Sequence, residues 1–330
     1  MGKAFTGVDI GGQSVKLVSC QDGMPQKFVI EALPEGLVAD GRIVSHDAMA
    51  DFIKGIIKGA GMPKDAALAL SGDESLTRRL ELPVMSEKEL LINLPYEFRD
   101  YISQGKDRYY YDYALYEISQ PEEEGATQSM DLMACAVQKQ TITEYEAMFR
   151  RAGLRLRCAL PASAALQNMV SRVNSEESCC IIDFAHASTK LTFFAKGRLD
   201  VTRSIELGGI DIDRAIAESF DVDAFVARGY KQSDYNNAQT CQAAMDTYES
   251  IAVEIARALN FYGFNNPDLE LTNVYYIGGG ASLVSLVNTV RENINVALKP
   301  VEALFANGSV SPDLLPISFT AIGATLRAGE

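Results

Sequence analysis

The apolar and polar positions of the chain alternate in two stretches that share one design. In residues 7–18 and again in 181–192, an apolar strand ends at an aspartate, small and polar residues turn the chain, and an alternating strand returns with a lysine in it. The two stretches match in the same register: Asp9 with Asp183, Ser14 with Ser188, and Lys16 with Lys190. The pattern predicts two hairpins of one construction, although two ordinary hairpins with small-residue turns would each show half of it.

The rest of the chain predicts strands followed by packed helices, which is a mixed α/β organisation. Ser45 caps a helix that ends at Gly61, and capping boxes at Ser86–Glu89 and Thr141–Glu144 open two more, the second ending at Gly153. We expect further helices over 161–173, 209–220, 243–262, 283–290 and 319–326, strands over 27–32, 67–70, 76–82, 108–118, 131–137, 154–160 and 274–277, and a polar connection over 231–242. Residues 67–150 group into a small inserted subdomain of strands and helices.

Charge and composition exclude several classes of protein. The net charge of −14 argues against nucleic acid as a partner, because nucleic acid demands a basic surface, and against electrostatic attachment to an anionic bilayer. We find neither a signal peptide nor an apolar run near the roughly 18 residues of a membrane span, so we expect a cytoplasmic protein. The six cysteines lack Cys-x-x-Cys spacing and are expected to be buried and reduced, and two histidines argue against a histidine metal site.

The two predicted hairpins have the chemistry of a phosphate site. A turn of small residues can direct several backbone N–H groups at one point, which makes a concave site for an anion. The lysine adds a mobile positive charge, and the aspartate can hold a metal ion directly or through water. Two such hairpins facing each other would hold the phosphates of a nucleotide from both sides.

Residues 278–280 are three consecutive glycines between an expected strand and an expected helix. A flat ring such as adenine can lie against backbone without side chains, and a helix start after Ser282 would offer unpaired N–H groups. A purely structural glycine turn would look the same. The sequence is not a dinucleotide fingerprint, because Leu283 stands where the final glycine of that pattern belongs.

Taken in order, the two hairpins, the Gly208-Gly209 turn, the triple glycine and the small-residue helices at 161–166 and 320–326 resemble the superfamily of actin, sugar kinases and heat-shock chaperones. Within it the chain resembles the PilM family of the type IV pilus inner-membrane platform over nearly its whole length. The segments that carry this likeness are 9–11, 15–17, 33–36, 40–43, 80–90, 111–113 and 254–262. The chain is also similar to the cell-division protein FtsA, but it stops at Leu326–Glu330, where FtsA continues into an amphipathic membrane helix.

The resemblance implies a two-lobed actin-like α/β fold, a duplicated ribonuclease H-like design with an inserted α+β subdomain. Lobe I would comprise 1–66, completed by 151–175 and 311–330, and lobe II would comprise 176–310. The implied cofactors are ATP or ADP and Mg²⁺, with Asp9 and Asp183 facing the metal. The other implied nucleotide-binding residues are Gly11, Gly12, Gln13, Ser14, Lys16, Ala185, His186, Ala187, Ser188, Lys190, Gly208, Gly209, Gly278, Gly279, Gly280 and Ser282.

Three departures from the family pattern predict weakened nucleotide binding. Ala185 stands at a usual glycine, where its methyl group would crowd a phosphate or oppose the backbone angle of the turn. Leu160 precedes Pro161 where an acidic residue is usual, and residues 224–228 lack the glutamates of the purine-holding pattern. No residue is identified as a catalytic group that activates water.

The function that the resemblance implies is a scaffold at the inner face of the membrane. It would recruit the cytoplasmic N-terminal peptide of a PilN-like membrane protein to a groove near the inserted subdomain, together with other pilus platform proteins. It would not span the membrane itself. Alternatives are an active ATPase or small-molecule kinase, an FtsA-like division scaffold, and a self-associating filament.

Overall fold

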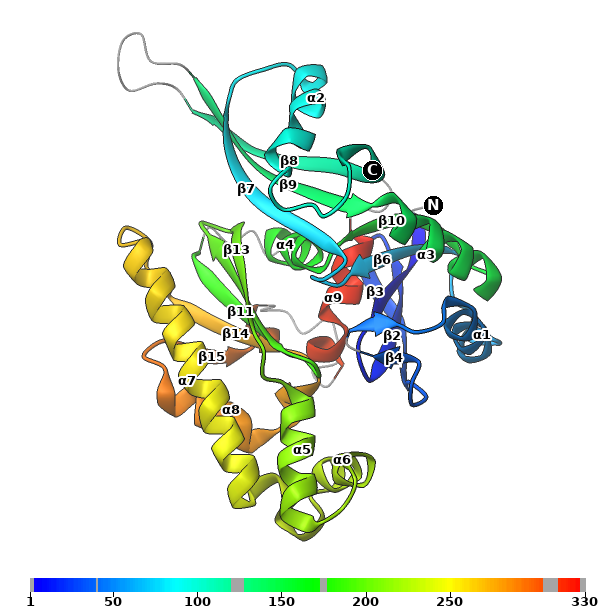
Figure 1. Ribbon diagram of the computed structural model, residues 1–330, viewed down its shortest axis with the longest axis vertical. Helices are drawn as coiled ribbons and strands as arrows, with labels where there is room; N and C mark the ends of the chain where they lie inside the picture. Colours follow the sequence, from blue (N-terminus) through cyan, green and yellow to red (C-terminus); the bar gives the residue numbers. More distant parts are fainter. Residues whose placement is uncertain (1–2, 40, 120–127, 173–176, 305–313, 327–330) are drawn as a thin grey trace.

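Two five-stranded sheets of the same layout form the centres of the two lobes (Figure 1). This computed structural model describes residues 3–39, 41–119, 128–172, 177–304 and 314–326. The sheet of lobe I has the order β10 (Arg155–Pro161), β6 (Asp65–Leu70), β1 (Ala4–Ile10), β2 (Ser14–Gln21), β3 (Met24–Ala32). Strands β1 to β3 are antiparallel, and β6 and β10 continue the sheet in parallel with β1.

The sheet of lobe II repeats this arrangement. Its order is β13 (Arg198–Ile205), β12 (Thr189–Ala195), β11 (Cys179–Phe184), β14 (Asn273–Ile277), β15 (Ala297–Pro300), with three antiparallel strands followed by two parallel ones. The predicted duplicated α/β fold is therefore confirmed. The predicted limits at 173–175, 311–313 and 327–330, the turn residue Asp40 and the start and end of the chain lie outside the described residues.

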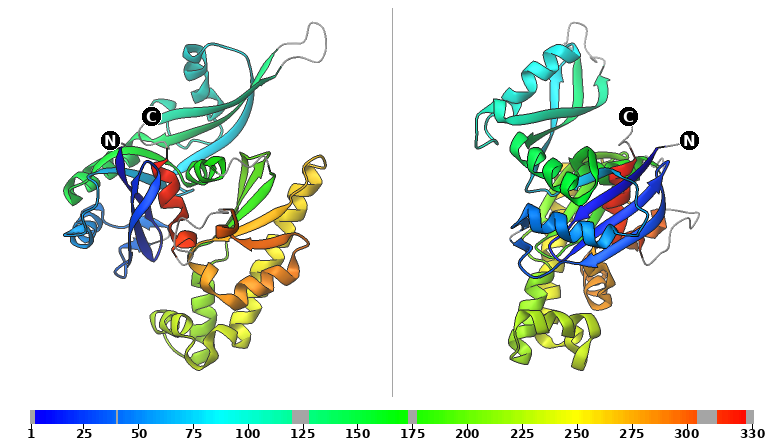
Figure 2. Two further views of the ribbon diagram at one scale, coloured as in Figure 1. Left: turned by 180° about the vertical axis from the view of Figure 1, so that it is seen from behind. Right: turned by 90° about the vertical axis from the view of Figure 1, so that its right-hand side faces the viewer.

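Two helices of small residues, α4 (Ala162–Arg172) and α9 (Leu315–Thr325), pack between the sheets (Figures 1 and 2). A Cβ on Gly323 of α9 would lie 2.1 Å from the carbonyl oxygen of Ala165 in α4. A Cβ on Gly7 of β1 would lie 1.9 Å from the carbonyl oxygen of Ala321. Glycine at these positions lets backbone approach backbone, so the two lobes share one core around these helices.

The remaining helices cover the outer faces. Helices α1 (His46–Ile57) and α3 (Lys139–Ala152) pack together on lobe I, and α5 (Gly209–Phe220), α6 (Ala224–Ser233), α7 (Gln242–Asn265) and α8 (Val284–Asn293) belong to lobe II. Short elements complete the described chain: β4 (Val38–Ala39), β5 (Arg42–Ile43), η1 (Lys106–Arg108), η2 (Tyr235–Thr240), η3 (Gly279–Ser282) and η4 (Val301–Leu304). No helix of the described residues is both long and apolar enough to cross a membrane.

The inserted subdomain is a three-stranded sheet with one helix on it, at the top of Figure 1. The sheet has the order β7 (Ser75–Pro83), β9 (Ser129–Gln138), β8 (Tyr109–Ser119), and α2 (Glu87–Glu97) packs on one face. The capping box at Ser86 and Glu89 forms as predicted. Because β6 pairs within the lobe I sheet and α3 packs on α1, the expected range 67–150 includes these flanking elements of lobe I.

Several local predictions differ from the structure. Helix α3 begins at Lys139, directly after β9, so Thr141 lies inside the helix and the expected capping box there does not form. Most of the polar connection expected over 231–242 is the end of α6 and the turn η2. Strands β13 and β15 were not predicted, and the four residues of β15 carry little periodicity.

Candidate functional site

Each predicted hairpin places its aspartate directly opposite its lysine. Asp9 pairs with Lys16 across β1 and β2, and Asp183 pairs with Lys190 across β11 and β12. In the first hairpin the carboxylate of Asp9 lies 3.5 Å from the ammonium of Lys16. The repeated pattern in the sequence thus corresponds to the same cross-strand geometry in both lobes.

The structure brings the two aspartates together. Burial raises the pKa of Asp183 above its ordinary value, and the nearby negative charge of Asp9 raises it further, while Lys16 and Lys190 act in the opposite direction. Residues from both lobes therefore act on one partly buried carboxylate. Lys190 also extends toward lobe I, because a Cβ on Gly72, in the turn after β6, would lie 3.3 Å from its ammonium.

The turns of the two hairpins touch as well. A Cβ on Gly12 would lie 3.2 Å from the His186 ring, so the first turn packs on the second. In the second turn the carbonyl oxygens of Ala185 and His186 accept hydrogen bonds from the N–H groups of Gly209 and Ile210, at the start of α5. The turn at 208–209 is thus used to fix the second hairpin.

Ala185 does not have the backbone angle for which glycine would be needed, since its φ is negative. The expectation that its Cβ would oppose the turn conformation is therefore wrong, and of the two effects expected of Ala185 only crowding of a ligand remains. Gly208 carries the tight contact instead, since a Cβ there would lie 2.6 Å from the carbonyl oxygen of His186 and 2.7 Å from the N–H nitrogen of Ser188.

The triple glycine lies directly beside the second hairpin. Gly278 has a φ of +94°, and a Cβ there would lie 2.3 Å from the Asp183 carboxylate. A Cβ on Gly280 would lie 2.7 Å from Cβ of Phe184, whereas Gly279 has nothing within 4 Å. Ser282 donates to the carbonyl of Gly279 within η3, and α8 begins two residues later. The glycines thus bring backbone close to Asp183 and leave one open face.

A polar cluster across the lobes was not predicted from the sequence. Asp213 of α5 is buried, with Oδ1 2.6 Å from Nζ of Lys231 and Oδ2 3.6 Å from Nε of Arg228, both on α6. Gln13 of the first turn reaches this pair. The Gln13 amide can face this cluster in two orientations. In one, its oxygen accepts a hydrogen bond from Arg228 Nε at 2.8 Å, and in the other its nitrogen donates to Asp213 Oδ2 at 3.4 Å.

His186 belongs to the same cluster, with its Nε2 3.2 Å from the Gln13 amide. Burial lowers its pKa to about 4, and the charge of Asp213 only partly offsets this effect. The ring is therefore neutral at pH 7, which suits a hydrogen-bonding role beside a phosphate and makes it a weak base.

The metal-binding potential of this site rests on two carboxylates. The described residues contain no group of three or more histidine, cysteine, aspartate or glutamate side chains placed to hold a metal ion. Two carboxylates from opposite lobes suit Mg²⁺, which commonly keeps several waters and takes its other ligands from phosphates. The donor set therefore fits a hydrated Mg²⁺ bound together with a phosphate ligand.

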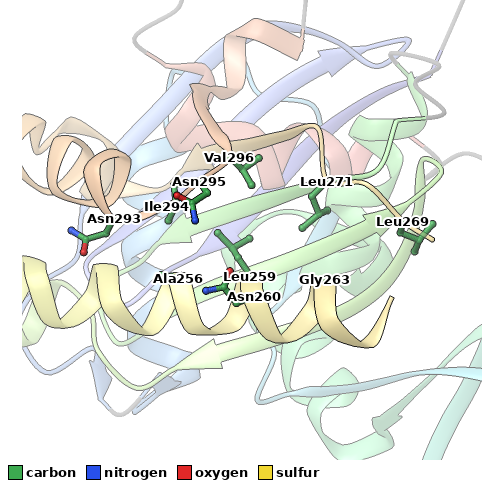
Figure 3. A pocket seen from close by; sticks show the side chains of 10 residues that line it. All are labelled: Ala256, Leu259, Asn260, Gly263, Leu269, Leu271, Asn293, Ile294, Asn295 and Val296. Atoms are coloured by element: carbon green, nitrogen blue, oxygen red, sulfur yellow. The ribbon is translucent and has the colours of Figure 1, made fainter. Parts of the chain in front are cut away.

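A cavity of about 350 Å³ lies elsewhere, on lobe II, between α7 and the segment that leads into β15 (Figure 3). Its lining includes Leu259, Asn260 and Val296 and no residue of the two hairpins. It is therefore separate from the site between the lobes.

Comparison with known proteins decides the family. The family model for type IV pilus assembly protein PilM matches residues 7–325. The chain belongs to the PilM family. A search of curated proteins found no match. A solved structure described as a PilM-PilN type IV pilus biogenesis complex is similar with a TM-score of 0.82 and 23% identity, covering 98% of each chain.

Other solved structures share the fold of this PilM family member at lower similarity. The ethanolamine utilization protein EutJ from Carboxydothermus hydrogenoformans has a TM-score of 0.63 and 15% identity, covering 99% of this chain and 90% of its own. MreB 5 of Spiroplasma citri, solved with AMPPNP, has a TM-score of 0.54 and 11% identity, covering 97% and 94%. The actin-like fold predicted from the motifs is confirmed.

Proposed function

We propose that this PilM family member is a nucleotide-binding scaffold of the type IV pilus platform, on the cytoplasmic side of the inner membrane. One observation carries the proposal: the two hairpins place Asp9, Asp183 and two lysines around one point between the lobes. That is a site for a metal-bound polyphosphate. Family membership supplies the assembly in which such a site would serve.

In this proposal the residues implied by the resemblance bind different parts of the nucleotide. Residues 11–14 and 185–188 would surround the phosphates, Lys16 and Lys190 would neutralise them, and Asp9 and Asp183 would hold Mg²⁺ through water. Residues 208–209 and 278–282 would border the ribose and base. The bound Mg²⁺ would supply charge neutralisation, while the chain's own residues bind and orient the phosphates.

Turnover is expected to be slow. In the described turns, Gln13 and His186 are the side chains suited to orient water or accept its proton, and they contact each other and the Asp213 cluster. Because His186 has a lowered pKa of about 4, it is also a weak base at neutral pH. Steady-state ATP hydrolysis tests this point, and a robust magnesium-dependent rate would favour the enzyme alternative.

We further propose that the partner is the cytoplasmic N-terminal peptide of a PilN-like membrane protein, which docks on the inserted subdomain. The similar solved complex contains PilM and PilN. In the present chain, half of the exposed large apolar side chains of the described residues lie within 75–138: Val84, Leu91, Ile92, Tyr96, Tyr101, Tyr110, Leu115 and Ile118. Strand β8 is an edge of its sheet, so a peptide could also add as a strand.

Calorimetric titration with a synthetic peptide of that N-terminus tests the docking. Ile92 on α2 and Leu115 on β8 are 59% and 48% exposed, so Ile92→Glu and Leu115→Glu should leave folding intact. We expect at least one of them to weaken binding about tenfold or more, since an interface core excludes charge. Val284→Glu, at a 67% exposed residue of lobe II, is the matched control. If all three variants bind the peptide as tightly as the wild type does, docking on the inserted subdomain is contradicted.

Pull-down with the intact protein from its native cell tests the assembly more broadly. Recovery of pilus platform proteins would support the scaffold. Recovery of division proteins, a metabolite kinase partner or only further copies of this chain would favour the FtsA-like, kinase or filament alternative instead.

A further inference from the structure

An ion-pair network joins the inserted subdomain to lobe II, away from the nucleotide site. Arg79 of β7 holds Asp131 of β9 with two hydrogen bonds, Nε to Oδ1 at 2.9 Å and Nη2 to Oδ2 at 2.7 Å. Its remaining nitrogen, Nη1, contacts Asp200 of β13 at 2.5 Å. One guanidinium is thus anchored in the inserted subdomain and reaches into lobe II.

Asp200 occupies a special place in its sheet. It is the extra residue of a β-bulge, because Phe193 pairs with Val201 and Phe194 pairs with Leu199. Its second oxygen accepts a hydrogen bond of 2.9 Å from the hydroxyl of Tyr262, near the end of α7. The Asp200 side chain is only 15% exposed, and its contact with Tyr262 is partly buried, whereas the Arg79 side chain is 41% exposed.

Helix α7 connects this network to the site between the lobes. At its far end the ring of Tyr262 stacks on Phe193, with ring centroids 4.1 Å apart. Toward its beginning, Tyr248 and Ile251 are buried in the core that α7 shares with α5 and α6. Helix α5 begins at Gly209, whose N–H donates a hydrogen bond to the turn of the second hairpin, so α5 and α7 connect that turn to Tyr262 through one packed core.

We propose that the Arg79–Asp200–Tyr262 contact couples the nucleotide site to the peptide-docking subdomain. This inference rests on the proposed function, because it assigns a regulatory link to the two ligands proposed there. Closure of the lobes on a nucleotide moves lobe II relative to the inserted subdomain, and this contact forms in one arrangement and not in the other. By linkage, each ligand changes the affinity for the other by the same factor.

The test measures peptide affinity by calorimetry with and without magnesium-AMPPNP. In the wild-type protein we expect the two affinities to differ by about fivefold or more, the lower end of typical coupling. Asp200→Ala removes the contacts to Arg79 and Tyr262 and leaves the Arg79–Asp131 pair intact, and it should reduce the difference below about twofold. Tyr262→Phe keeps the ring stack and should reduce the difference partly, which gives a milder variant should Asp200→Ala fold poorly.

Glu117→Gln is the matched control. It breaks the exposed pair of Glu117 with Arg198, which joins the same two parts of the molecule at 3.1 Å, and should leave the coupling unchanged. Equal peptide affinity with and without nucleotide in a wild-type protein that binds both would overturn the coupling and leave the proposed function standing. Wild-type coupling that survives in both Asp200→Ala and Tyr262→Phe would overturn it too. Failure of the wild type to bind peptide or nucleotide would overturn the proposed function and this inference with it.

Discussion

Replacing Gly323 by alanine should force apart the two helices that join the lobes. The new Cβ would lie 2.1 Å from the oxygen and 2.7 Å from the carbon of the Ala165 carbonyl, and backbone atoms cannot rotate out of the way. Overpacking of this kind costs about 1–3 kcal/mol. The better helix propensity of alanine offsets up to about 1 kcal/mol of this cost. We expect a net loss of about 1–2 kcal/mol.

Gly55→Ala provides the matched control. Gly55 is an exposed residue of helix α1, and a Cβ added there would have nothing within 4 Å, so the same substitution should stabilise the protein by about 0.5–1 kcal/mol. Urea unfolding followed by circular dichroism measures both, with midpoints compared because a two-lobed protein need not unfold in one step. A Gly323→Ala midpoint equal to or above that of the wild type would refute the tight packing of α4 on α9.

Three further predictions concern the site between the lobes. Burial and the charge of Asp9 raise the pKa of Asp183, so the native protein binds the carboxyl proton more tightly than the unfolded chain does, and ionisation at neutral pH costs stability. Asp183→Asn should therefore raise the melting temperature of the ligand-free protein. It should also weaken magnesium-dependent nucleotide binding. With its pKa lowered to about 4, His186 should keep one NMR ring shift from pH 8 to about pH 5, and stability should fall as acid protonates this residue in the unfolded chain below about pH 6.5. Gly278→Ala should destabilise by about 1–3 kcal/mol in thermal unfolding, because of its positive φ and the nearby Asp183 carboxylate, whereas Gly279→Ala should change stability by less than about 0.5 kcal/mol.

The contradicting results are equally specific. A lower melting temperature for Asp183→Asn would mean that the ionised carboxylate is stabilised in the native state. A ring shift of His186 that titrates near pH 6.5 would show that the ring is exposed. Equal stability of the Gly278→Ala and Gly279→Ala variants would show that Gly278 is not tightly packed against the second hairpin.

The hairpins could be predicted because their information is local. An aspartate next to the end of one strand and a lysine seven positions later fix a cross-strand pair once the turn length is set, and both copies have that spacing. The end of α3 at Gly153, with φ of +89°, is local in the same sense. What these patterns determine is the shape of each element.

Contacts between elements could not be read from the sequence. Lys231 lies in a stretch that looks polar and solvated, yet it is buried on Asp213, eighteen positions away on another helix. Gln13 meets Arg228 only because the two lobes close on each other. The boundary of the inserted subdomain depends on β6 pairing with β1 and β10, which no property of residues 65–70 alone reveals.

The central claim is that the two hairpins form one site for a magnesium-bound nucleotide. Calorimetric titration of magnesium-ATP into the wild-type protein and into Lys16→Gln tests it most directly. We predict binding in the micromolar range for the wild type and at least about tenfold weaker binding for the variant, which is a loss of about 1.4 kcal/mol. Absence of any binding heat at millimolar nucleotide, in wild-type protein shown to be folded, would contradict the account.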